Sequence, residues 1–176
     1  AGVALNSDFT VKVRLQDGVW HTLSSYLIKV DEVRDTRHYV ENASMAIFDF
    51  TGKVEVAVTY NLGEVQTAKV RPLSYDIPFQ IDGNTVTFTL EHPRNLSVEV
   101  NGDIFHNLHL FTGSPERTIP DKDNPEVIYF GPGIHTVKNG ELRVPSGKTV
   151  YLAGGAVLMG RVLIENVHDV KLLGRG

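Results

Sequence analysis

Cysteine is absent from the 176-residue sequence. This excludes a disulfide framework and a thiolate metal site, and it leaves no thiols from which to read the redox compartment. Long apolar runs are missing as well, because no stretch approaches the roughly 20 residues that a membrane-spanning helix needs. The apolar run at residues 1–5 is too short for a signal-peptide core, so we expect that any export signal has been removed. Export remains open, and we expect no membrane partner.

Positive charge is also scarce. The sequence has 17 Lys and Arg against 21 Asp and Glu, which gives a formal net charge of -4. Proteins that bind nucleic acid neutralise phosphates with clustered Lys and Arg, so we expect no nucleic-acid partner. Hydrophobic residues make up 41% of the chain, which suffices for a sizeable core in one domain or in two small ones.

Strict alternation of apolar and polar residues marks the first part of the chain. A period of two is the signature of a half-buried strand. It occurs in runs at residues 9–15, 54–60, 86–90 and 96–100. Turn sequences such as Asp17-Gly18 and Thr51-Gly52 lie between runs, as hairpin loops do. The pattern predicts an N-terminal antiparallel β-sandwich in an all-β protein.

The segment from Asp31 to Ala46 admits a second interpretation. Val33, Arg37 and Val40 have the spacing of one helix face. Its β-branched residues disfavour a helix, however, so we predict loop and strand here.

A charged segment rich in Pro, at residues 113–126, has little apolar content. Such composition is typical of a surface connection. We therefore expect a β-sandwich domain at 1–112, a linker at 113–126 and a second unit at 127–176.

The second unit contains a repeat. Three versions of one pattern end in glycine corners, with Gly131, Gly154 and Gly174 spaced 23 and 20 residues apart. Within it, 134–137 aligns with 156–159, and 142–144 aligns with 162–164. Repeats of this length are typical of solenoids. We expect the first coils of a right-handed parallel β-helix and, because one coil cannot bury its own face, a fragment of a longer protein. The alternative is that these residues only add strands to the sandwich.

Residues 127–160 (VIYFGPGIHTVKNGELRVPSGKTVYLAGGAVLMG) resemble the start of the β-helix in certain polysaccharide hydrolases. The sequence is similar to glycoside hydrolase family 49, the dextranase and isopullulanase group, and more distantly to the polygalacturonase family with its pectin lyase-like fold. Family-49 enzymes carry a β-sandwich ahead of the helix. The runs at 9–15, 70–73 and 96–111 fall where that sandwich would lie.

The resemblance implies the N-terminal segment of a secreted or periplasmic glycoside hydrolase. Its substrate would be a dextran-like glucan or a pectin-like galacturonan, cleaved with inversion by aspartates. In such families those aspartates lie on middle coils, and their motif is not found in this sequence. We therefore assign no catalytic residue, no cofactor and no metal, and we expect this segment alone to be inactive. Its expected partners are the polysaccharide and the remainder of its own β-helix.

Two readings of another class stay open beside this one. The sandwich could be a carbohydrate-binding module, which a planar row of exposed aromatic residues would favour. The β-helix could also continue as a non-catalytic adhesin or tail fibre. Lyase activity remains a variant of the enzyme reading, since related β-helix proteins include lyases that use calcium.

Several polar residues invite a chemical interpretation. Asp121 to Asn124 offer oxygens for calcium, but the loop lacks the glycine and the glutamate of a calcium-binding loop. His106 and His109 are i and i+3 in a predicted strand and so should point to opposite faces. His135 follows a glycine corner and is expected on a coil surface. A joint metal site is therefore not expected.

Two glycine corners and five aromatic residues complete the candidates. Gly131-Pro132-Gly133 and Gly154-Gly155-Ala156 do not match a phosphate-binding loop, so we interpret them as corners of the solenoid. Aromatic rings suit the apolar faces of sugars, but core packing or scattered surface positions are the expected roles. The residues in question are Trp20, Tyr26, Tyr39, Tyr60 and Tyr75.

Overall fold

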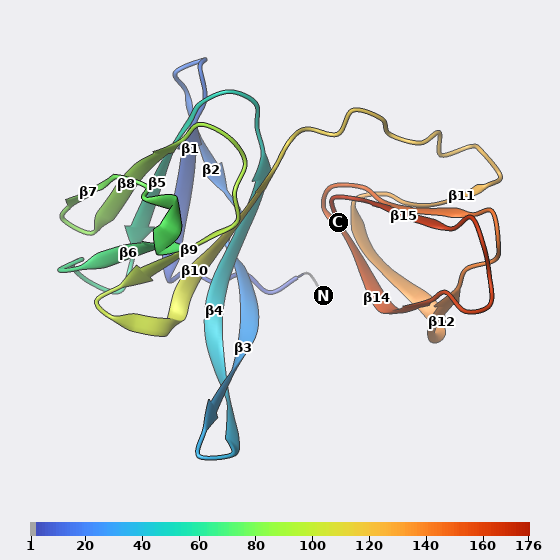
Figure 1. Cartoon of the computed structure of the whole chain (residues 1–176), viewed down its shortest axis with the longest axis horizontal. Helices are drawn as coiled ribbons and strands as arrows, with labels where there is room; N and C mark the ends of the chain where they lie inside the picture. The colour runs from blue at the N-terminus through green and yellow to red at the C-terminus, as the bar shows by residue number, and fades with distance from the viewer. Residues whose placement is uncertain (1–2) are drawn as a thin grey trace. The chain divides into compact units, whose positions relative to one another are not determined.

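A computed structural model describes residues 3–176 (Figure 1). The chain divides into two compact units, Val3–Pro115 and Glu116–Gly176. The division lies inside the segment that composition marks as a connection. Within the described residues, no helix is long and apolar enough to cross a membrane. Strands and turns make up nearly all of both units, as the sequence predicts, with one short 3-10 helix, η1 (Leu73–Tyr75).

The first unit contains two five-stranded sheets. All pairs in the first sheet are antiparallel. Its strand order is β2 (Trp20–Leu23), β1 (Phe9–Arg14), β5 (Val54–Tyr60), β8 (Thr85–Leu90) and β7 (Phe79–Asp82). The predicted alternating runs at 9–15, 54–60 and 86–90 thus become β1, β5 and β8.

The second sheet is mixed. Its order is β3 (Tyr26–Arg34), β4 (Arg37–Asp49), β10 (Asp103–Gly113), β9 (Leu96–Val100) and β6 (Ala68–Arg71). β4 and β10 run parallel at its centre, with Leu108 beside Ser44, and the other pairs are antiparallel. Parallel neighbours need a long connection, and here β5 to β9 intervene between the two. Short-range alternation carries no information on such a pairing.

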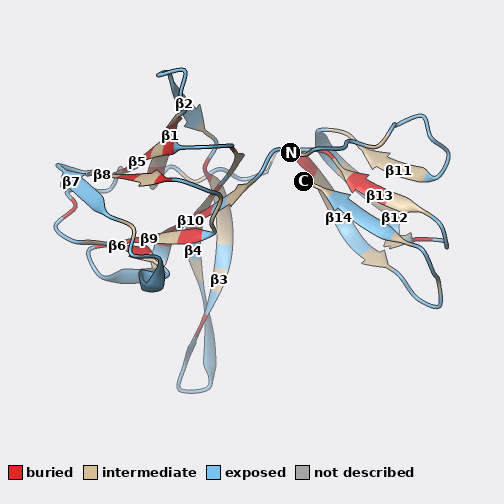
Figure 2. Cartoon of the chain, turned by 45° about the horizontal axis from the view of Figure 1, so that its top comes forward, coloured by how far each residue is buried: buried red, intermediate tan, exposed pale blue. Residues whose placement is uncertain are grey.

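The core lies between the two sheets. Alternate residues of the central strands are buried, as Figure 2 shows by the red stretches in β1, β5, β8 and β10. Val56, Val86, Leu108 and Leu110 have no exposed surface. One continuous apolar cluster joins residues of both sheets. Burial of apolar surface at about 25 cal/mol per Å² is the dominant force that holds the sheets together.

A long hairpin occupies the segment for which a helix was the alternative. β3 and β4 pair antiparallel from Tyr26 beside Met45 to Arg34 beside Arg37. Only Asp35 and Thr36 form the turn, both with positive φ (46° and 68°). The helical alternative is wrong, and the segment contains more strand than the predicted mixture of loop and strand. The helical spacing was incidental, because Val33 and Val40 near the hairpin end are exposed.

The second unit consists of parallel coils. β11 (Val127–Phe130), β13 (Thr149–Leu152) and β15 (Lys171–Gly174) form one parallel sheet. β12 (Gly133–Arg143) and β14 (Ala156–Leu163) form another. Val127 lies beside Thr149 and Thr149 beside Lys171, so one coil takes 22 residues. The predicted order of a sandwich and then parallel coils is confirmed.

The register of the coils differs from the predicted alignment. Gly174 pairs with Leu152, which pairs with Phe130, so the three glycines of the sequence repeat are not equivalent. Ala156 lies beside Gly133 rather than beside Ile134. The alignment of 142–144 with 162–164 was correct. The predicted alignment matched the glycines, whereas the register is set by the hydrogen bonds between strands. The corner that contains Gly154 and Gly155 has one residue more than the corner of the preceding coil, so the glycines fall out of register.

Gly160 accommodates an insertion in the preceding coil. The register of β12 against β14 shifts between Thr136 and Glu141, where Asn139 and Gly140 have positive φ. Gly160 has a φ of 148°, and a Cβ there would lie 2.9 Å from the Gly140 carbonyl oxygen and closer still to Val137. The missing side chain thus lets the longer coil fold over its neighbour.

Tyr151 fastens the start of the second unit to its first sheet. Its ring is buried and lies 5.1 Å from the ring of Tyr129 in the adjacent coil. Its hydroxyl donates a 2.7 Å hydrogen bond to the Glu116 carboxylate. That hydrogen bond, with burial, raises the pKa of Tyr151 to about 12. The segment before β11 is therefore held to the coils through Glu116.

We predict that Leu108→Ala destabilises the sandwich by about 2–5 kcal/mol, because it leaves a cavity in a core where Leu108 has no exposed surface. Urea unfolding followed by tryptophan fluorescence measures this, since the chain has one tryptophan, Trp20, and it lies in β2. The control is Leu62→Ala, whose side chain is 64% exposed. The control should change stability by less than about 0.5 kcal/mol. Equal effects of the two substitutions would contradict the described core.

Candidate functional site

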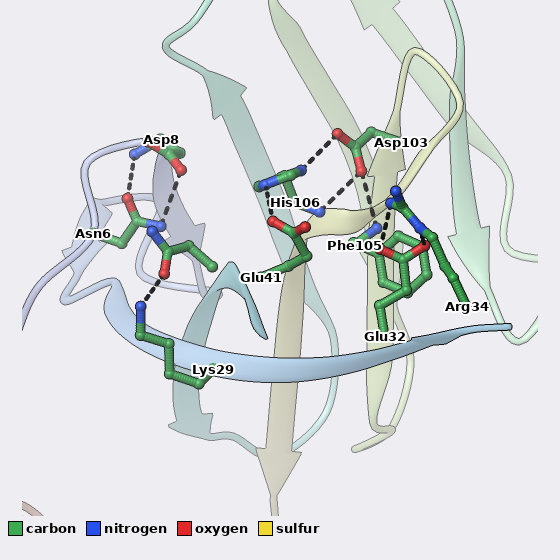
Figure 3. A network of polar contacts seen from close by, with 10 residues as sticks. Asn6, Asp8, Lys29, Glu32, Arg34, Glu41, Asp103, Phe105 and His106 are labelled. Carbon is green, nitrogen blue, oxygen red and sulfur yellow. Dashed lines mark hydrogen bonds and ion pairs between the residues drawn. The ribbon is translucent and has the colours of Figure 1, made fainter. Parts of the chain in front are cut away.

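A histidine between two carboxylates forms a polar cluster in the sandwich (Figure 3). His106 Nδ1 lies 2.9 Å from Asp103 Oδ2, and His106 Nε2 lies 3.1 Å from Glu41 Oε2. Asp103 and His106 come from β10 and Glu41 comes from β4, its parallel neighbour. With a carboxylate on each ring nitrogen, the imidazole is favoured in its doubly protonated form.

The backbone of β10 creates this arrangement. Its register shifts between Asp103 and Leu108, so residues there leave the regular ladder. Asp103 Oδ1 accepts hydrogen bonds from the backbone N–H groups of Phe105 and His106, each 2.9 Å long. The preceding Asn101 and Gly102 both have positive φ. The side chain of Asp103 thus replaces the ladder and aims His106 at Glu41.

The electrostatics follow from these hydrogen bonds. The Asp103 carboxylate raises the pKa of His106 above its ordinary value, and Glu41 adds to the effect. Partial burial raises the pKa of Asp103, but the N–H groups of His106 and Phe105 outweigh it, so the pKa lies below the ordinary value. A charged imidazole whose two ring nitrogens both contact carboxylates links β4 to β10. It lacks the free nitrogen that a base or a metal ligand needs.

His109 has a different environment from His106. Its ring stacks on Phe111, with ring centroids 6.3 Å apart, and burial lowers its pKa. Strict alternation of side chains does not hold between His106 and His109, because the register of β10 shifts between Asp103 and Leu108. Among residues 3–176, no group of three His, Asp or Glu side chains is placed to hold a metal ion.

Two further carboxylates of the sandwich are buried, and the first of them, Glu32, is drawn in Figure 3. Glu32 is 7% exposed and pairs with Arg34 in the same strand. Glu99, 5% exposed, pairs with Arg71. Each of these buried carboxylates faces a guanidinium, as burial of a charge requires. A general acid must be able to reach an atom of the substrate, whereas each of these carboxylates is buried against an arginine of the sandwich.

The five candidate aromatic residues do not share one surface. Tyr60 packs on Phe9 beside the core, and Tyr26 begins β3. Trp20 lies on the edge strand of the first sheet, Tyr39 near the turn of the β3–β4 hairpin, and Tyr75 in η1 (Figure 1). Trp20, Tyr39 and Tyr75 are 38–39% exposed, and each carries an arginine over one ring face.

A hollow of about 610 Å³ lies beside η1, and we call it the η1 hollow. It is lined by Ser74, Tyr75, His92, Pro93, Arg94, Asn95 and Thr112. These residues come from η1, from the turn between β8 and β9, and from the end of β10. The Arg94 guanidinium lies 4.4 Å from the centroid of the Tyr75 ring, and its Nε donates a 2.8 Å hydrogen bond to His92 Nε2.

A second, smaller hollow of about 240 Å³ lies on the coils. Its lining is mainly apolar, with one acidic and one basic side chain. The residues are Arg143, Val144, Pro145, Leu163, Glu165 and Val167. Glu165 and Arg143 thus line the same hollow, one with a carboxylate and the other with a guanidinium.

The remaining candidates of the coils form corners and turns. His135 Nε2 lies 2.7 Å from the Gly131 carbonyl oxygen, so its N–H closes the glycine corner. The Gly133 N–H donates to the Gly155 carbonyl oxygen at 2.9 Å, which stacks one corner on the next. In the 121–124 loop, Asp121 Oδ1 accepts the Asp123 N–H at 3.0 Å. Each of these groups has a structural partner.

Sequence reasoning missed both polar groupings of the sandwich. For the histidine cluster a local signal existed, because Asp103 and His106 follow the turn pair Asn101-Gly102. The η1 hollow offered none, since Tyr75 and Arg94 are 19 positions apart and Thr112 another 18. Only the pairing of the strands brings them together.

We predict that the stability advantage of the wild type over His106→Gln is larger near pH 6 than near pH 9. A histidine with a raised pKa contributes fully below its ordinary value of 6.5, and the contribution is lost as the pH rises through the raised value. The cluster is partly exposed, so the effect should be at most about 1 kcal/mol. Urea unfolding at the two pH values measures it.

The control for this test is His168→Gln. The side chain of His168 is 81% exposed, so its replacement should change stability little. A wild-type advantage over His106→Gln that stays constant or grows between pH 6 and pH 9 would refute the charged form of His106.

No family model matches the chain, and no curated protein matches it. Among solved structures the chain is similar to Dex49A from Penicillium minioluteum, with a TM-score of 0.61 and 17% identity. The alignment covers 90% of this chain and 43% of Dex49A, so the chain spans less than half of the length of that protein. Likeness at this identity shows the fold. The two proteins share a β-sandwich followed by parallel coils.

Proposed function

We propose that this chain is the N-terminal segment of a glycoside hydrolase that acts on a polysaccharide. The observation that carries the proposal is the likeness to Dex49A, a dextranase of glycoside hydrolase family 49, over 90% of the chain. The likeness extends through both units. The independent resemblance of residues 127–160 to the same family supports it.

The proposed reaction is hydrolysis with inversion of the anomeric carbon. One carboxylic acid protonates the leaving oxygen, and a carboxylate roughly 6.5–9.5 Å away activates a water on the opposite face of the sugar. In this proposal both groups are aspartates on coils that follow Gly176. The coils of β11 to β15 supply the stacking surface on which further coils continue. The buried carboxylates of Glu32 and Glu99 each pair with an arginine of the sandwich, and the proposal gives them a structural role rather than a catalytic one.

The proposed substrates are a dextran-like glucan or a pectin-like galacturonan. Polysaccharides of this kind lie outside the cytoplasm, and we propose a secreted or periplasmic protein. The absence of cysteine agrees with any compartment.

Glycan binding without cleavage is the second candidate. The aromatic residues give it little support, because Trp20, Tyr39 and Tyr75 lie on separate parts of the sandwich. The η1 hollow is the observation that favours it.

We predict that the protein encoded by the complete reading frame releases sugar with inverted anomeric configuration from dextran, pullulan or polygalacturonate. NMR of the anomeric protons during the first turnovers distinguishes inversion from retention. The 176-residue chain is the matched control, and it should release no reducing sugar. Retained configuration would contradict the mechanism, and full activity of the chain alone would contradict the placement of the aspartates. Binding without cleavage by the complete protein would favour the second candidate.

A further inference from the structure

Three exposed aromatic residues of the sandwich carry an arginine over the ring, and their charge balance differs. Arg14 lies over Trp20 and Arg34 over Tyr39, at 4.7 and 5.3 Å from the ring centroids. Arg14 donates a 2.6 Å hydrogen bond to Glu55, and Arg34 binds both oxygens of Glu32. In both pairs the chain supplies its own carboxylate.

Arg94 over Tyr75 has no such carboxylate. Within residues 3–176 its side chain contacts the Tyr75 ring and donates from Nε to His92. Its two terminal nitrogens have no hydrogen-bond partner in the described chain. A guanidinium carries five N–H donors in a rigid fork that matches the two oxygens of a carboxylate. The fork of Arg94 is thus available to a ligand.

The hollow around Arg94 has the composition of a site for an anion. None of the seven described residues that line it is acidic. His92 accepts from Arg94 through Nε2, so its own proton lies on Nδ1 as a further donor. Asn95 and Ser74 add an amide and a hydroxyl suited to sugar hydroxyl groups. This positive and polar hollow occurs in a chain whose net charge is -4.

Arg94 is also held in place before a ligand arrives. The Thr112 hydroxyl accepts the Arg94 backbone N–H at 2.6 Å and donates to the Arg94 carbonyl oxygen at 2.8 Å. The ring of Tyr75 and the imidazole of His92 fix the far end of the side chain. A guanidinium fixed in advance loses less side-chain entropy on binding.

We propose that the η1 hollow binds the carboxylate of a uronic-acid unit in an acidic polysaccharide. Arg94 binds the carboxylate, and the polar groups of the hollow bind the sugar hydroxyls. The guanidinium already covers one face of Tyr75, so the hollow selects by charge rather than by stacking of a neutral sugar. The inference rests on the proposed action on polysaccharides and favours the galacturonan class over the neutral glucan class.

The test is an NMR titration of the 176-residue chain labelled with ¹⁵N in its arginines. The Nε–H signal of Arg94 is the one that disappears in Arg94→Gln. Trigalacturonate should shift this signal, and isomaltotriose at the same concentration should leave it in place. Because hydrogen bonds to charged groups contribute about 1.5–3 kcal/mol, Arg94→Gln should weaken trigalacturonate binding about tenfold or more.

The matched control is Arg14→Gln, which removes an arginine from an aromatic ring but leaves the η1 hollow intact. It should bind trigalacturonate as the wild type does. Acetate and inorganic sulfate distinguish a sugar site from a general anion site, and equal shifts with either would overturn the inference. A sulfated glucan that binds as tightly as trigalacturonate would overturn its preference for carboxylates.

The outcomes separate this inference from the proposed function. If trigalacturonate leaves Arg94 unchanged while the complete protein cleaves a neutral glucan, the inference fails and the proposed function stands. If trigalacturonate binds through Arg94 while the complete protein cleaves no polysaccharide, the inference stands as a binding function and the hydrolase proposal fails.

Discussion

A β-strand points alternate side chains to opposite faces, and the sandwich depends on this constraint. The apolar face of each sheet must be covered by the other, so every second residue of β1, β5 and β8 lies in the core, as do Leu108 and Leu110 of β10. Side chains that bind or react must therefore come from outward positions, strand ends and turns. Both polar groupings of the sandwich obey this rule, because one lies at the irregular start of β10 and the other beside its end.

The same constraint explains what the sequence could predict. Alternation is a local property, so strands such as Phe9–Arg14 and Val54–Tyr60 could be located to within a residue. The pairing of strands depends on hydrogen bonds between distant segments, and alternation does not encode it. The parallel pairing of β4 with β10 was therefore not foreseen. In the coils, equivalent glycines were taken as the register, whereas the ladder places Leu152 between Phe130 and Gly174.

The candidate sites were harder to predict than the fold for the same reason. His106 was considered with His109, three positions along the sequence, but its partners in space are Asp103 and, on another strand, Glu41. Tyr75 was considered as a platform for sugar stacking, but the residue that changes its chemistry is Arg94, which covers the ring. A side chain's type can be read from the sequence. What that side chain can bind depends on the charged groups that the fold places beside it.

The electrostatics of the η1 hollow set two effects against each other. A chain with net charge -4 repels a polyuronate at long range, whereas in the proposed site Arg94 attracts a carboxylate at contact. Salt screens exposed charges beyond about 10 Å at 0.1 M, so it weakens the repulsion between the whole molecules first. The contact between a fixed guanidinium and a carboxylate is screened less, because their separation is far shorter than that length. If the proposal holds, moderate salt should therefore speed the encounter with an acidic glycan while most of the contact is retained, and it should leave a neutral glucan unaffected.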